Sequence, residues 1–267
     1  MQRRPAFPAR LATGHPDTTK NIAQQLYPTS GSGQKTSQKS VVPAAEPFSG
    51  DLLAARERMV RQVQALGVPA PALLAAIGQV ARHRFVDTAL VGQAYEDTSL
   101  PIGLGQTISK PSVVARMAEL LCAAPITRGG TVRLGRILEI GTGCGYQAAV
   151  LARLAVEVYS IERLRGLHES ARDKLRPFRL ANVHLLFGDG MQGFAKGAPY
   201  AGIIAAAGGE ALPPAWIEQL AVGDRLVAPL VTDGGRQALI VIDKTINGCN
   251  RRVLEGVHFV PLKSGIA

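Results

Sequence analysis

The sequence predicts an α/β protein with a doubly wound, mostly parallel sheet. Three observations support this fold class. Apolar β-type runs alternate with helical runs from about residue 134, the first such run enters a helix through a glycine-rich turn, and the second run ends in a carboxylate. Alternation of this kind covers both faces of a sheet with helices, and ligands then bind beyond the carboxyl ends of the strands.

The expected elements begin with two helices, one that Asp51 caps and Gly67 ends, and one that opens at Pro69 and Pro71. A polar, glycine-rich loop over 92–111 follows. The other expected elements are a helix at 113–121, a linker at 127–131, strands at 136–140, 156–161, 183–187, 202–207, 224–230, 237–243 and 253–260, and helices at 145–155, 163–176 and 214–220. The early helices are therefore an N-terminal helical addition to the sheet.

Composition separates residues 1–50 from the rest of the 267-residue chain. This stretch holds six Lys or Arg against two Asp or Glu, several prolines and a Gly/Ser/Gln/Lys tract at 31–40. We expect a disordered basic extension, because so few apolar side chains cannot offset the entropy of ordering the backbone. A basic transit peptide is the alternative, whereas a secretory signal would need an apolar core. The domain then covers 51–267, with a helical and loop region at 51–125 and a ligand-binding core at 134–267.

Charge and cysteine usage exclude several classes of partner. The net charge is +10, yet outside the extension it is spread without a dense basic run, so we expect no nucleic acid partner. No apolar run approaches the ~18 residues of a membrane span, so we expect no membrane partner. Cys122, Cys144 and Cys249 are odd in number and widely spaced, which favours a reducing, cytoplasmic location and no metal site. We expect a monomer, since no heptad pattern is visible.

The glycine-rich turn lies within Leu138–Gln147 and places glycines at 141, 143 and 145. A strand that turns into a helix without side chains in the way lets the backbone approach a ligand closely. Seventeen residues after Gly145, the next β-type run ends in Glu162. A carboxylate at the tip of the second strand is placed to hydrogen-bond a ribose diol.

The ligand is decided by two departures from the dinucleotide fingerprint. Its third glycine would fall at position 146, which is Tyr146, and Glu139 precedes the first glycine by two residues. A carboxylate there suits a ligand with an ammonium group and discourages a pyrophosphate. S-adenosylmethionine has an ammonium, a ribose and no phosphate, and we favour it over NAD. A glycine-rich turn used only for packing is the third interpretation.

Two further loops fall at the same edge of the predicted sheet. Asp189 and Gly190 follow the strand at 183–187, where a carboxylate can accept from an adenine amino group; a simple turn is the alternative. After the strand at 202–207, the proline pair Pro213-Pro214 is preceded by Leu212. Enzymes that methylate amines place Asp or Asn before such a pair, so adenine and cytosine N-methylation are disfavoured.

A family resemblance rests on the loop Asp97–Pro111 and its Leu-Pro-Ile-Gly…Gly-Gln-Thr-Ile-Ser run, with Leu138–Gln147, Gly188–Gly190 and the C-terminal Phe259-Val260-Pro261-Leu262. Together they resemble the protein-L-isoaspartate O-methyltransferases over about residues 51–264. The resemblance implies a Rossmann-like class I S-adenosylmethionine-dependent methyltransferase sheet. It implies methyl transfer to the α-carboxylate of L-isoaspartyl residues in damaged proteins and peptides, release of S-adenosyl-L-homocysteine, and repair through a succinimide. The family's active-site serine corresponds to Ser109.

The chemistry of this reaction needs no general base, because carboxyl groups titrate near pKa ~3.5–4 and are anionic at neutral pH. We hypothesise that Ser109 and Thr107, with Ile108 between them, bind and aim the acceptor carboxylate. The alternative is that Ser109 caps the helix that begins near Lys110. The residues predicted to bind the cofactor are Glu139, Gly141, Thr142, Gly143, Cys144, Gly145, Glu162, Asp189 and Gly190.

Some positions depart from the family pattern. Ala201 stands where an Asp usually opens the strand, and Ala206 where Thr is frequent. Two alternatives to the isoaspartyl reaction therefore stay open. One is a methyltransferase of the same cofactor with another carboxyl or small-molecule acceptor, and the other is a cofactor-binding module without catalysis.

Overall fold

A computed structural model describes residues 49–124, 133–232 and 234–267 of the chain. The predicted extension, apart from its last two residues, and the predicted linker at 127–131 lie outside these ranges. Within the described ranges, no helix is long and apolar enough to cross a bilayer.

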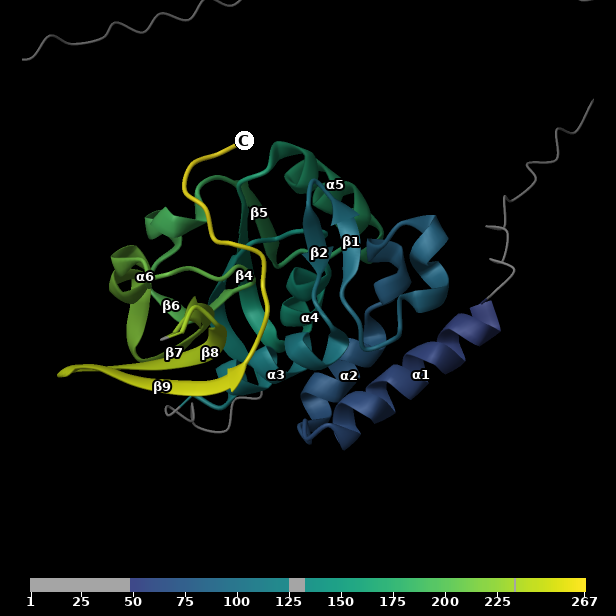
Figure 1. Cartoon of the computed structure of the whole chain (residues 1–267), viewed down its shortest axis with the longest axis horizontal. Helices are drawn as coiled ribbons and strands as arrows, with labels where there is room; N and C mark the ends of the chain where they lie inside the picture. Colours follow the sequence, from purple (N-terminus) through teal and green to yellow (C-terminus); the bar gives the residue numbers. More distant parts are fainter. Residues whose placement is uncertain (1–48, 125–132, 233) are drawn as a thin grey trace, which may run out of the picture. The chain divides into compact units, whose positions relative to one another are not determined.

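In the described part of the chain, seven strands form one sheet in the order β5-β4-β3-β6-β7-β8-β9 (Figure 1). The strands β5, β4, β3, β6 and β7 are parallel, and β8 and β9 are antiparallel additions at one edge. The predicted mostly parallel sheet is thus confirmed. The strand bounds are β3 Leu134–Ile140, β4 Ala155–Glu162, β5 Val183–Phe187, β6 Tyr200–Ala205, β7 Leu220–Val231, β8 Gln237–Thr245 and β9 Gly248–Gly256.

Helices cover both faces of the sheet. Ile137 and Leu138 are neighbours on β3 and point to opposite faces, yet both are fully buried, as expected for a central parallel strand. Ile137 lies in a cluster with residues of α3 (Pro111–Cys122) and α4 (Tyr146–Leu154). Leu138 packs on the other side with Trp216 of α6 (Pro214–Gln219). A further helix, α5 (Arg165–Leu175), contacts β4 and β5.

The N-terminal helices α1 (Ser49–Ala65) and α2 (Pro71–Gln79) form the predicted helical addition. They pack against α3 and α4 through a cluster that includes Met59, Leu73 and Ile77. Gly67 ends α1 with a φ of 97°, a left-handed conformation that glycine adopts without strain. The prediction that Asp51 caps α1 is wrong, because the helix already begins at Ser49 and Asp51 lies in its first turn.

Two further expectations, the loop over 92–111 and the bounds of the last strand, are wrong, because hydrophobic periodicity does not reveal the tight turns of a hairpin. The expected loop over 92–111 contains an antiparallel hairpin, β1 (Leu100–Gly103) and β2 (Gln106–Ile108). Leu100 and Ile108 pair across it and are both buried, which gives this short hairpin an apolar anchor. The last strand was expected near 253–260, but β8 pairs directly with β9 through Thr245 and Gly248, so the strand begins earlier.

The order of the strands creates a crevice beside β3. The chain runs from β3 through β4 to β5 on one side and returns to β6 on the other, so β3 has parallel neighbours on both sides. The connections that leave the carboxyl ends of β3 and β6 therefore diverge. Ligands of doubly wound sheets bind at such a point.

A buried ion pair ties the end of α3 to this sheet. The Nε and Nη2 atoms of Arg225 on β7 donate to the Asp243 carboxylate on β8 at 2.6 and 3.1 Å. Its Nη1 donates to the carbonyls of Leu120 and Ala123 at 2.8 and 2.6 Å. Since α3 begins two residues after Ser109, this guanidinium fixes the far end of the helix that follows the candidate serine.

Arg225→Met should lower the free energy of unfolding by about 3–5 kcal/mol, because it leaves a buried carboxylate without its main partner. The matched control is Arg252→Met, which removes a half-exposed arginine that reaches the same carboxylate at 3.3 Å and should cost less than about 1 kcal/mol. Urea denaturation measures both. Equal, small losses for the two variants would contradict the account.

Candidate active site

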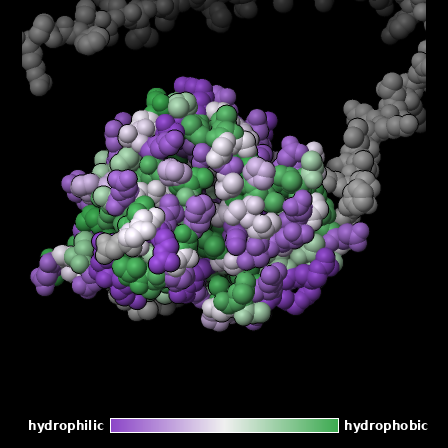
Figure 2. All heavy atoms as spheres, viewed as in Figure 1, coloured by the Kyte–Doolittle hydropathy of each residue, from purple (hydrophilic) through white to green (hydrophobic). Residues whose placement is uncertain are grey.

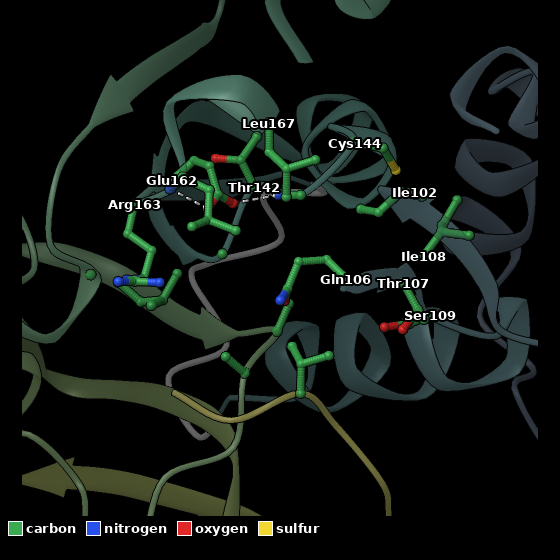
Figure 3. A pocket seen from close by; sticks show the side chains of 18 of the residues that line it. Ile102, Gln106, Thr107, Ile108, Ser109, Thr142, Cys144, Glu162, Arg163 and Leu167 are labelled. Atoms are coloured by element: carbon green, nitrogen blue, oxygen red, sulfur yellow. Dashed lines mark hydrogen bonds between the residues drawn. The ribbon is translucent and has the colours of Figure 1, made fainter. Parts of the chain in front are cut away.

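A cavity of about 420 Å³ lies at the carboxyl ends of β3 and β4 and beside the residues that follow β6. Its walls come from the β1–β2 hairpin, the glycine-rich turn, the start of α5 and the C-terminal segment 260–263. In Figure 3, Thr107 and Ser109 lie on one side of this space, Glu162 and Thr142 lie on the opposite side, and Gln106 reaches in between. Residues from 102 to 263, far apart in the sequence, thus meet at the predicted edge.

The acceptor side holds the three residues predicted for it, since Thr107, Ile108 and Ser109 all line the cavity. Ser109 is not a helix cap, so that alternative is wrong. The N-cap of α3 is Lys110, which makes no side-chain cap hydrogen bond. Instead, the Asp97 carboxylate accepts from the Ser112 backbone N–H at 2.8 Å and from its hydroxyl at 2.7 Å. The Ser109 side chain is thereby left to face the cavity.

A buried arginine holds the backbone of Ser109. The Arg82 guanidinium is fully buried and donates from Nε to the Ala94 carbonyl at 2.8 Å and from Nη2 to the Ser109 carbonyl at 2.7 Å. It also stacks over the Tyr146 ring, with Cζ 4.7 Å from the ring centroid. Tyr146 is the first residue of α4, so Arg82 connects the loop that carries Ser109 to the helix that follows the glycine-rich turn. Burial lowers the pKa of Arg82 from its ordinary value.

The cofactor side brings together most of the residues predicted for it. Gly141, Gly143 and Gly145 have φ angles of 88°, 56° and 91°, which favour glycine at each position. The N–H groups of Gly141 and Thr142 both donate to the Ile161 carbonyl, so this turn is bound to β4. The predicted cofactor residues that line the cavity are Gly141, Thr142, Gly143, Cys144, Glu162 and Gly190.

Glu162 sits at the carboxyl end of β4, as the spacing predicts. One carboxylate oxygen accepts from the Gly143 N–H and the other from the Leu164 N–H, both at 2.9 Å. A carboxylate oxygen has two lone pairs, so each oxygen keeps one for a ligand hydroxyl. The side chain lines the cavity and is held in place, which fits a role in gripping a diol.

Glu139 is set below the cavity rather than in its lining. Its side chain is fully buried and accepts a short hydrogen bond from the Ser160 hydroxyl, and Ser160 is 2.6 Å from the Thr142 hydroxyl. Thr142 lines the cavity, so two hydroxyls connect the buried carboxyl to it. Burial raises the pKa of Glu139 to about 8, against which the hydrogen bond from Ser160 acts. Its predicted role toward an ammonium group stays a prediction.

Gly145 and Asp189 also lie outside the cavity lining. A Cβ at Gly145 would lie 2.8 Å from Leu175 Cδ1, so this glycine makes room for the side chain of the last residue of α5. The Asp189 carboxylate accepts from the Met191 N–H at 2.8 Å and from the Gly265 N–H at 2.7 Å. The C-terminal segment therefore binds the residue predicted to contact adenine, and that role is still a prediction.

The C-terminal segment runs from β9 past the carboxyl ends of the strands to α5 (Figure 1). Ala267 exchanges two backbone hydrogen bonds at 2.8 Å, its N–H with the Arg163 carbonyl and its carbonyl with the Arg165 N–H. Sequence patterns did not predict this contact. They also missed Arg82 and Ser160, and the indole of Trp216, which donates to the Gly190 carbonyl at 2.8 Å. Arg82 lies in a basic run and Ser160 in a strand-like run, and neither pattern distinguishes a residue of the site.

Comparison with known proteins assigns the chain to a family. Residues 54–267 match the family model for protein-L-isoaspartate(D-aspartate) O-methyltransferase. The chain belongs to this family. It is 53% identical to the protein-L-isoaspartate O-methyltransferase of Methylibium petroleiphilum over 98% of this chain and 96% of that protein. It is 56% identical to that of Leptothrix cholodnii, over 79% and 74%.

Solved structures agree with the fold. A protein-L-isoaspartate O-methyltransferase matches 79% of this chain and 67% of its own, with a TM-score of 0.70 and 26% identity. A structure described as a putative member of the family from Plasmodium falciparum matches 78% of this chain and 98% of its own, with a TM-score of 0.65 and 21% identity. That protein is in complex with S-adenosyl-L-homocysteine. The likeness places the sheet described above among methyltransferase folds, as predicted.

Arg82→Lys should loosen the loop that carries Ser109, because lysine lacks the planar fork that reaches two carbonyls at once. We expect a loss of about 1–3 kcal/mol in unfolding free energy and roughly tenfold faster amide exchange across 94–109. Arg84→Lys, at an exposed neighbouring position, is the control and should change neither. Wild-type exchange in the Arg82 variant would refute the role of this guanidinium.

Glu139 should make stability depend on pH. The folded-state pKa of about 8 lies above the ordinary value of 4.5, so the protonated carboxyl is favoured by folding. Its contribution is present below about pH 4.5 and is lost as pH rises toward 8, by up to a few kcal/mol. Urea denaturation between pH 5 and pH 8 should show a fall for the wild type that Glu139→Gln lacks. Parallel pH profiles would contradict the raised pKa.

Proposed function

We propose that this cavity transfers a methyl group from S-adenosylmethionine to the α-carboxylate of L-isoaspartyl residues in proteins and peptides. The chain is a methyltransferase of the isoaspartate family, and its relatives over nearly the full length bear that name. The observation that carries the assignment of residues is one cavity with Ser109 and Thr107 on one side and Glu162 with the glycine-rich turn on the other.

The residues present fit an adenosyl cofactor. Glu162 offers one free lone pair on each oxygen for a ribose diol, and the left-handed glycines leave the turn open on the cavity side. Gly190 lies against Ile140, where a Cβ would come within 2.6 Å of its Cγ2, so only glycine fits there. When bound, S-adenosylmethionine supplies an electrophilic methyl group attached to a positively charged sulfur.

The acceptor side positions a nucleophile that is already charged. Ser109 and Thr107 offer hydroxyl donors to a carboxylate. The hydrogen bond from Arg82 to the Ser109 carbonyl fixes the backbone that carries the Ser109 hydroxyl. The carboxylate oxygen bonds to the methyl carbon as the carbon–sulfur bond breaks, and no proton is transferred. The chain therefore has to orient the oxygen and exclude water, an effect worth up to roughly 7–11 kcal/mol of a barrier.

The wider role follows from the product. A methyl ester at this position makes the carbonyl a better electrophile for the next backbone nitrogen, so a succinimide can form and part of it hydrolyses to normal aspartate. We infer that the reaction initiates protein repair. Another carboxyl or small-molecule acceptor is not favoured, because the relatives that match most of the chain carry the isoaspartate name.

We infer that the protein acts in the cytoplasm as a monomer. Cys122, Cys144 and Cys249 are all free thiols, as expected in a reducing compartment. Figure 2 shows polar and apolar residues interspersed over the visible face of the domain, without the large apolar patch typical of an obligate interface.

The experiment that tests the function uses labelled S-adenosylmethionine with paired peptides that differ only in an aspartyl or isoaspartyl linkage. Label should enter the isoaspartyl peptide alone and in a base-labile form, as a methyl ester requires. Label in both peptides, or a base-stable product, would overturn the proposal. Cofactor binding without transfer would identify a binding module.

Ser109→Ala should lower turnover with the isoaspartyl peptide by about 10- to 100-fold, because a misplaced acceptor loses orientation. The affinity for S-adenosylhomocysteine and the urea midpoint should stay at wild-type values. Ser109→Thr, which keeps the hydroxyl, is the matched control and should recover part of the activity. Normal turnover in the alanine variant would remove Ser109 from the mechanism.

A further inference from the structure

A second and larger hollow, of about 1050 Å³, adjoins the cavity. The two share Thr107, Ser109, Ala206 and Val260 in their linings, so they meet at the candidate acceptor residues. From there the hollow extends to the turn between β7 and β8 and to the segment 253–260. When the isoaspartyl carboxylate of a polypeptide reaches Ser109, the residues on either side of the isoaspartyl residue have to lie in this hollow or along the β1–β2 hairpin.

Among the described residues, the charged side chains that line this hollow are basic, and Asp233, in the turn before Arg236, lies outside the described residues. Lys110, Arg236 and His258 line it and are all exposed, and its lining contains no Asp or Glu among the residues that the structure describes. We call it the basic groove, defined by these three residues. No described carboxylate forms an ion pair with Lys110 or Arg236. The carboxylate of Glu255, next to the lining residue Leu254, is bound to Arg116 at 2.9 Å.

Hydrogen bonds hold two of the described segments that line the basic groove. The hydroxyl and N–H of Thr232 both donate to the Arg236 carbonyl, at 2.9 and 2.8 Å, which closes the β7–β8 turn. Gln237 binds Phe259 from both sides, accepting from its N–H at 2.7 Å and donating to its carbonyl at 3.1 Å. Arg236 and His258, which are next to Gln237 and Phe259 in the sequence, are therefore held close to each other, and Lys110 lines the same hollow.

We propose that the basic groove receives the polypeptide next to the isoaspartyl residue and that Lys110 and Arg236 favour substrates with an acidic flanking side chain. This inference rests on the proposed function and names the preferred class of substrate. Two exposed cations attract a carboxylate and repel an ammonium group over a few ångströms. An exposed pair contributes about a twofold to fivefold change in affinity, and salt screens it.

The test uses isoaspartyl hexapeptides that are identical except for Glu, Gln or Lys at one flanking position, in one set on the amino side and in another on the carboxyl side. In at least one set, wild-type kcat/KM should be about fivefold or more higher for Glu than for Lys, mostly through KM, with Gln between. Raising the salt to 0.5 M should shrink this ratio, as screening requires. The measured quantity is the ratio of kcat/KM for the Glu peptide to that for the Lys peptide. A change at Lys110, next to Ser109, could alter turnover with all peptides alike, and the ratio cancels such an effect.

The variants that decide the matter are Arg236→Gln and the double variant with Lys110→Gln. The double variant should bring the Glu-to-Lys ratio to about twofold or less, and Arg236→Gln alone should lower it part of the way. Lys196→Gln removes the same charge at an exposed position outside the groove and should leave the ratio unchanged.

A wild-type ratio near one in both sets, or a ratio that survives in the double variant, would overturn the assignment of the basic groove. So would an equal loss in the Lys196 control, because the effect would then come from net charge. If the wild type methylated none of the peptides, including the neutral Gln peptide, the proposed function itself would fail, and the groove assignment with it.

Discussion

The buried Arg82 guanidinium connects the two halves of the candidate site, the loop that carries Ser109 and the helix that follows the glycine-rich turn. It binds the Ala94 and Ser109 carbonyls and lies over the Tyr146 ring, at the first residue of the helix that follows the glycine-rich turn. A cation without water around it is costly to bury, so the surrounding carbonyls have to stay in place to satisfy it. The acceptor loop and the cofactor turn are thereby coupled through one side chain. Reactions that depend on orientation rather than on a strong base need that rigidity.

The sheet supplies the rest of the arrangement. Because β3 and β4 are parallel neighbours, the turns that follow them lie at the same edge of the sheet and both line the cavity. Glu162 is fixed there by two backbone N–H groups, and Glu139 reaches it indirectly through Ser160 and Thr142. Glu162 lines the cavity, whereas Glu139 lies beneath it and is connected to the lining residue Thr142 through Ser160. Both acidic side chains are buried near the ends of adjacent strands, and they differ in their contact with the cavity.

The sequence predicted what is decided locally and missed what depends on packing. Apolar alternation and the glycines at 141, 143 and 145 predicted the sheet and its turn, since both follow from backbone geometry. Arg82 begins an Arg-His-Arg run and looks solvated in the sequence. Its burial follows from contacts with residues far along the chain, Ala94, Ser109 and Tyr146. The hydrogen bond from Gly265 to Asp189 joins residues 76 positions apart, and no periodic pattern signals it. The spacing predicts a ligand role for Gly145, and it cannot reveal the close contact of this glycine with Leu175.

The most direct test of the account is a crystal structure of the protein with S-adenosylhomocysteine and an isoaspartyl peptide. The account requires an oxygen of the isoaspartyl α-carboxylate within about 2.5–3.0 Å of the Ser109 hydroxyl, and the ribose hydroxyls on Glu162. That oxygen should face the cofactor sulfur across the space a methyl group would fill. A peptide bound with its carboxylate turned away from Ser109, or a cofactor outside the turn at 141–145, would contradict it.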